Sequence, residues 1–279
     1  MQEDLAQIFC AALSCVCALL IIATWLFGRA APRVNFSVRL VTYFAVANLV
    51  TSGMAIINDV DRLRVGDAVC VMFALLEWYS TLASWLWTGA IAVAFRVCFQ
   101  TGTIDLSAIV ERKMHAVCWL APAALLGAAL AMGASFGSTD PSTGHCGWID
   151  THGRNKVADA SADVVILGCL LTVTLGDCWA VVSVYLILRN LRKCTASEPL
   201  AAQQPARNQQ MWRTFTAYVV AFVCTQGPRG LWDAGRDARP GALSSAQLVG
   251  KQAVFCLSYS HGFCNAVVWG MSNKQLWQR

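Results

Sequence analysis

Charged residues are scarce in this sequence. Asp, Glu, Lys and Arg make up 13% of its 279 residues, whereas 57% of the residues are hydrophobic. Because soluble domains carry about 25% charged residues, this composition excludes an ordinary soluble protein and favours a membrane protein. The formal net charge is +5, but the basic residues are dispersed between apolar segments, which indicates membrane topology rather than binding to nucleic acid.

The motifs of enzymes and metal sites are also missing. The four histidines form neither an HxxxH nor an HExxH pair, and the spacing of Cys15-Val-Cys17 is not one that binds zinc. The chain has no phosphate-binding loop and no internal repeat, so inverted-repeat transporters lose support. We expect a protein that is not an enzyme, with no catalytic residue, no metal and no cofactor.

What the sequence does contain is long apolar runs, and residues 68–95 form the one that best defines the fold. A helix of this length crosses a bilayer at a tilt, and its single formal charge is Glu77. Its polar residues recur at steps of three and four, so they share one helix face that must point toward protein or water. These polar residues are Glu77, Ser80 or Thr81, Ser84 and Thr88.

Seven such segments predict an all-α membrane protein in which one domain, residues 1–279, forms a seven-transmembrane helix bundle. The predicted spans are residues 5–27, 40–58, 68–95, 114–136, 161–188, 210–231 and 243–271. Only four residues precede the first span, so we expect that helix to act as an uncleaved insertion signal.

The basic residues orient the bundle. Of the 21 Lys and Arg residues, 13 fall in the 1–2, 3–4 and 5–6 loops and the C-terminal segment, and seven fall in the other loops. The positive-inside rule therefore predicts that the N-terminus lies outside and the C-terminus lies in the cytosol.

Two cysteines stand apart from the other eleven. Cys70 and Cys146 are the only ones of the 13 at or beyond the outer membrane edge in this topology. An oxidising exterior would join them and tie the third span to the loop of residues 137–156. The alternative is two unpaired thiols.

The seventh span has a second polar stripe. Its members return to one helix face, at spacings of 4, 7, 3 and 4. For Ser258 and Asn265 we favour hydrogen bonding within a packed core. Lys251 could face the interior or reach outward to water, and its depth suggests an ion pair with Glu77. The stripe consists of Gln247, Lys251, Ser258, His261 and Asn265.

Cations also collect at the outer ends of the spans, which suits an anionic small ligand through charge steering. Most of them are explained by lipid headgroups and nearby Asp residues. Arg229, which follows Pro228 and lies nearest the bundle, is the exception. The predicted ligand-binding residues are Glu77, Trp78, Arg229, Lys251 and Tyr259.

Several short motifs, in order along the membrane core, resemble those of the slime-mould cyclic-AMP receptors, which are G-protein-coupled receptors. The third span carries a Cys-Trp-Leu-Trp-Thr-like motif, the fourth a Cys-Trp-x-x-Pro motif, the following loop a Cys-Trp-Ile-like motif, and the seventh a Ser-His-Gly-Phe motif. The segments are Ser84-Trp85-Leu86-Trp87-Thr88, Cys118-Trp119-Leu120-Ala121-Pro122, Cys146-Gly147-Trp148-Ile149 and Ser260-His261-Gly262-Phe263. The sequence departs from the family at Gly147 and in lacking a long tail after Arg279.

This resemblance implies a multi-pass receptor of the plasma membrane, surrounded by lipid, that binds a small extracellular ligand and activates a heterotrimeric G protein. Cyclic AMP is the ligand that the resemblance implies. The expected G-protein-facing residues are Arg96, Arg189, Arg192 and Arg213.

A retinal-binding light-sensing or light-driven protein is the main rival, because a seventh-helix lysine and a third-helix acid could serve as Schiff base and counter-ion. Lys251 argues against it, since it lies six residues, or roughly 9 Å, from the middle of its span near Leu257. A lipid or solute transporter is the third possibility.

Overall fold

The computed structural model describes residues 2–27, 36–60, 67–101, 108–131, 135–138, 146–149, 182, 185, 217–218, 220–228 and 245–272. Most of the predicted fifth span, the start of the sixth span and Arg189, Arg192, Arg213 and Arg229 lie outside these residues.

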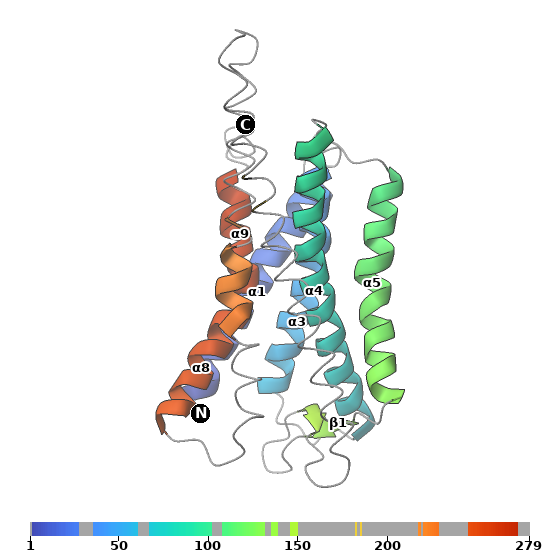
Figure 1. Cartoon of the computed structure of the whole chain (residues 1–279). Coiled ribbons are helices and arrows are strands. Elements are labelled where there is room, and N and C mark those ends of the chain that lie inside the picture. The colour runs from blue at the N-terminus through green and yellow to red at the C-terminus, as the bar shows by residue number, and fades with distance from the viewer. Residues whose placement is uncertain are drawn as a thin grey trace.

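The described residues form long helices that run alternately up and down the molecule (Figure 1). They are α1 (Gln2–Phe27), α3 (Phe36–Val60), α4 (Asp67–Thr101), α5 (Ala108–Ala131), α8 (Ser245–Tyr259) and α9 (His261–Ser272), and residues 220–228 are also helical. Four stretches within α1, α3, α4 and α5 are long and apolar enough to cross a membrane. The stretches are Leu5–Phe27, Val38–Ile57, Ala68–Ala94 and Ile109–Ala131.

The fourth predicted span, 114–136, is displaced relative to its helix. The helix α5 begins at Ala108, where Glu111 is held by Arg39, and it ends at Ala131. Phe136 lies beyond it in strand β1 (Ser135–Ser138), which pairs antiparallel with β2 (Cys146–Ile149). The apolar run therefore continues past the helix because Phe136 packs into the core from a hairpin.

The hairpin is tied to the central helix. A disulfide joins Cys70 on α4 to Cys146 on β2, with their Cα atoms 5.1 Å apart, which confirms the predicted bridge. Phe136 is buried against α4 and α5, and Gly147 pairs with Gly137 across the hairpin. The hairpin consequently lies against the end of the bundle at which α1 and α4 begin (Figure 1).

The predicted seventh span, 243–271, is two helices, because α8 and α9 meet at a turn at Ser260. In a regular helix the amide of Phe263 would donate to the carbonyl of Tyr259. Instead, the Ser14 hydroxyl of α1 accepts a hydrogen bond from the Phe263 amide at 3.3 Å and donates one to the Tyr259 carbonyl. A side chain inserted into the backbone ladder is a recognised cause of a helix kink.

Gly262 permits this insertion. A Cβ atom at this position would lie 3.0 Å from the Cβ and 3.3 Å from the Oγ of Ser14. Both Cβ atoms are fixed to their backbones, so neither could rotate away. The helices α1 and α9 can therefore approach this closely only with glycine here.

We expect Gly262→Ala to destabilise the protein by about 1–3 kcal/mol, because the added methyl group overpacks the contact with α1. The matched control is Gly270→Ala in the same helix, where a Cβ meets nothing within 4 Å. This control should leave stability unchanged or raise it by up to about 1 kcal/mol through helix propensity. Thermal unfolding of the purified variants measures both, and equal midpoints would contradict the proposed contact.

Candidate functional site

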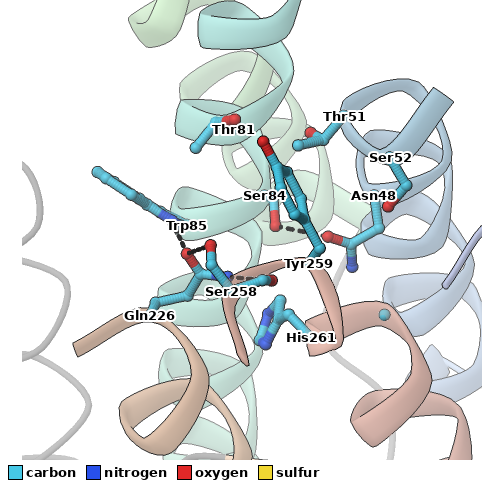
Figure 2. Close-up of a pocket in the computed structure, with 11 residues that line it drawn as sticks. Asn48, Thr51, Ser52, Thr81, Ser84, Trp85, Gln226, Ser258, Tyr259 and His261 are labelled. Carbon is cyan, nitrogen blue, oxygen red and sulfur yellow. Dashed lines mark hydrogen bonds between the residues drawn. The ribbon is translucent and has the colours of Figure 1, made fainter. Parts of the chain in front are cut away.

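A small polar cavity lies among α3, α4, residues 220–228 and the junction of α8 and α9 (Figure 2). The volume open to the centre of a water molecule is ≈ 20 Å³. Lining side chains come from all of these elements, and hydroxyl and amide groups dominate them. The lining residues are Asn48, Thr51, Ser52, Thr81, Ser84, Trp85, Gln226, Ser258, Tyr259, His261 and Gly262.

Gln226 connects three elements at one side of this cavity. Its Oε1 accepts hydrogen bonds from the Trp85 indole at 3.3 Å and from the Ser258 hydroxyl at 3.1 Å. Its Nε2 donates to the Ser258 backbone carbonyl at 3.1 Å. The amide is thus satisfied at both ends although the residue is buried, which is what a polar group in lipid requires.

His261, the first residue of α9, is a second junction. Its Nδ1 lies 2.7 Å from the Thr225 hydroxyl, and its Nε2 lies 3.1 Å from Nδ2 of Asn265. Its ring also meets the edges or faces of Phe44 and Phe222, at centroid distances of 5.2 and 5.6 Å. The imidazole therefore contacts α3, residues 220–228 and its own helix.

The hydrogen bonds fix the tautomer of this imidazole. Nδ2 of Asn265 also donates to the His261 carbonyl at 2.9 Å, which identifies it as the nitrogen end of the amide. An amide nitrogen only donates, so the imidazole Nε2 must accept and the ring proton is on Nδ1. Nδ1 then donates to Thr225, whose own hydroxyl donates to the Ala221 carbonyl at 2.7 Å. If Nε2 carried a proton, its N–H would face the N–H of Asn265 and neither would have an acceptor there.

The opposite wall is made by α3 and α4. The Ser84 hydroxyl donates to Oδ1 of Asn48 at 3.0 Å, and the Thr51 and Ser80 hydroxyls lie 2.9 Å apart. These bonds join the middle of α3 to the polar stripe that the sequence predicts on α4. The stripe accordingly faces protein.

The predicted ligand-binding residues are not gathered at this cavity. Tyr259 lines it, whereas Glu77 is half-buried and Trp78 packs with the cluster that contains Phe136 and Cys146. Arg229 lies outside the described residues. Of the predicted set only Tyr259 lines the cavity, and the ligand-binding role of all five residues stays a prediction.

The hypothesis of an ion pair between Glu77 and Lys251 is wrong. Among the described residues no such pair forms, and Nζ of Lys251 lies 5.7 Å from the ring centre of Phe255. Phe255 is four residues further along α8, so the ammonium meets its own helix neighbour first. A contact at this distance is a cation–π interaction.

The sequence reasoning singled out Thr81, Ser84, Ser258, His261 and Asn265 but missed the residues that complete the network. For Ser258 and Asn265, hydrogen bonding within the core is confirmed. Missed residues on α3 are Asn48, Thr51 and Ser52, whose spacing of three and four inside an apolar span is the signal that could have found them. Gln226, two residues before Pro228 in an uncharged stretch, is the other missed residue.

At the end of the bundle opposite the hairpin, Arg39 and Glu111 form a bidentate ion pair between α3 and α5. Nε and Nη2 of Arg39 donate to the two carboxylate oxygens at 3.0 and 2.9 Å. On α3, α4 and α5, four rings pack against one another with neighbouring ring centroids 4.2–5.9 Å apart. They belong to Tyr43, Trp87, His115 and Trp119. Arg96 is half-buried near the same end of α4.

Among the described residues, no three His, Cys, Asp or Glu side chains gather where they could hold a metal ion. No family model matches the sequence. A search of curated proteins likewise finds no match.

The fold is that of a known class of seven-helix membrane proteins. The chain is similar to squid rhodopsin as seen in its crystal structure, with a TM-score of 0.75. The two chains are 13% identical, and the match covers 99% of this chain and 83% of squid rhodopsin. At this identity the likeness shows the fold alone. The predicted all-α seven-helix membrane fold is thereby confirmed, and within the described residues the β1–β2 hairpin is its only β-structure.

We expect Gln226→Leu to lower the free energy of unfolding by about 1–3 kcal/mol, because it leaves the Trp85 indole and the Ser258 hydroxyl without their acceptor. The matched control is Gln252→Leu, since Gln252 is half-buried on α8 and does not line the cavity. Reversible unfolding in detergent measures both variants. Equal losses would show that the Gln226 network contributes nothing beyond residue size.

Proposed function

We propose that this protein is a seven-helix receptor that binds a small ligand at the end of the bundle carrying the hairpin. The signal passes through the polar core to a G protein at the opposite end. Support comes from the fold shared with squid rhodopsin and from the disulfide that fastens the hairpin to α4. The observation that carries the proposal is the network in which Gln226 and His261 join α4, residues 220–228 and α8–α9. In our proposal the ligand binds one packing of this network more tightly than another and so shifts the population between them.

The proposed ligand site lies between the cavity and the hairpin. The cavity itself has ≈ 20 Å³ open to water centres, whereas small-molecule pockets measure about 300–1,000 Å³. Trp78 of α4 and Cys146 of the hairpin both pack against the cluster that contains Phe136. We propose that Glu77, Trp78, Arg229, Lys251 and Tyr259 bind this ligand, and that it is an anionic small molecule with cyclic AMP as the first candidate.

The G-protein surface lies at the other end, at the end of α4 and the beginning of α5. Arg96 is there, and the Arg39–Glu111 pair holds the first turn of α5 against α3. We propose that Arg96, Arg189, Arg192 and Arg213 form the basic surface that a G protein contacts. The proposed orientation is N-terminus outside and C-terminus in the cytosol of a plasma-membrane protein.

Nucleotide exchange on purified G proteins tests this proposal. The receptor in lipid nanodiscs is assayed with cyclic AMP, other nucleotides and amines, and an anionic member of the panel should accelerate exchange. Lys251→Gln should then weaken ligand binding about tenfold, or 1.4 kcal/mol, because it removes the half-buried cation. Lys113→Gln, an exposed cation at the opposite end of the bundle, should leave ligand affinity unchanged. Ligand-coupled solute flux without exchange would instead identify a transporter.

A light-sensing protein is the second candidate, since the fold is shared with squid rhodopsin and α8 carries a lysine. Lys251 interacts with Phe255 and does not line the cavity, which argues against a buried Schiff base. Retinal added to the purified protein should therefore produce no visible absorbance band. A band that appears and is lost on Lys251→Ala would reverse the choice between the two functions.

A further inference from the structure

One buried amide in the bundle has an incomplete set of hydrogen bonds. Asn48, on α3, is 6% exposed and lines the cavity. Its Oδ1 accepts from Ser84, while its Nδ2 has no hydrogen-bond partner among the described residues. Figure 2 shows the oxygen turned toward Ser84 and the nitrogen turned away from it. A buried donor left in this state costs about 1–3 kcal/mol, so a partner at this position is strongly favoured.

The cavity beside this amide has the size and chemistry for one bound molecule. A water molecule needs about 10–15 Å³ of such volume together with two to four polar partners. The cavity offers ≈ 20 Å³, and the hydroxyl-bearing residues Ser52 and Thr81 line it together with Asn48. Empty cavities in proteins are apolar, whereas polar cavities of this size hold water.

We propose that this cavity is a binding site for a single ordered water molecule that accepts a hydrogen bond from Nδ2 of Asn48. The free group is a donor, so it disfavours a cation. No lining residue carries a formal charge, so an anion has no counter-charge there. Turning the amide over would instead leave its oxygen without a donor. Water completes either arrangement because it both donates and accepts.

This water would lie where two halves of the bundle meet. Asn48 and Ser84 form one side, and Ser258, Tyr259 and His261 at the α8–α9 kink form the other. The water therefore extends the hydrogen-bonded core from α3 to the kink that Ser14 opens. The inference concerns hydration of the core and is independent of the proposed receptor activity.

Radiolytic labelling of the intact protein in ¹⁸O-water tests the site without any variant. Trp85 lines the cavity, whereas Trp269 packs in a different cluster, and both are 4% exposed. Because bulk exposure is equal, a bound internal water should make Trp85 gain ¹⁸O several-fold faster than Trp269. Equal rates would overturn the proposal.

Two further measurements separate water from other occupants. Asn48→Leu removes the donor and should lower the rate of ¹⁸O incorporation at Trp85 to that at Trp269. An unchanged rate at Trp269 shows that the variant is folded. An unchanged rate at Trp85 would contradict the proposed water site. Exchanging sodium chloride for choline gluconate should leave the melting temperature of the wild-type protein unchanged. A melting temperature that rises with sodium or chloride would identify an ion in place of water.

Discussion

A polar side chain inside a bilayer must find its hydrogen-bond partner within the protein, and this requirement organises the described core. Gln226 satisfies both ends of its amide through α4 and α8, and His261 uses both ring nitrogens. The bonds of Gln226 and the bond between Thr225 and His261 join different elements, whereas the bond between Asn265 and His261 lies within α9. Because lipid is as apolar as the side chains that face it, such contacts and close packing rather than the hydrophobic effect select how these helices lie together.

The same requirement explains the kink between α8 and α9. A broken backbone bond in lipid would be costly, yet here the Ser14 hydroxyl supplies both the donor and the acceptor that the break exposes. Gly262 lets α1 approach closely enough for this substitution. The kink lies next to the polar cavity, so the backbone irregularity and the hydrated part of the core occupy the same place. Because the kink divides the helix pair α8–α9 near the middle of the bundle, α8 and α9 could change their relative orientation there.

Much of this architecture could be predicted because it depends on local pattern. The polar spacing on residues 68–95 predicted a protein-facing stripe, and the positions of Cys70 and Cys146 predicted the disulfide. Contacts between helices could not be predicted in this way. Ser14 and Tyr259 are 245 residues apart, and neither residue alone signals a kink. Likewise, the position of Lys251 in the sequence suggested an ion pair with Glu77, but its ammonium lies 5.7 Å from the ring centre of Phe255.

Hydrogen bonds between helices hold residues 220–228 against α9, and the arrangement of the polar core depends on them. A double-mutant cycle of Thr225→Val and His261→Phe, measured as free energies of unfolding, tests this dependence directly, since the two side chains lie 2.7 Å apart. We predict a favourable coupling of about 0.6 kcal/mol or more, since such pairs in a membrane protein average about 0.6 and reach about 1.7 kcal/mol. A coupling of zero would show that packing alone positions these helices and would contradict the account.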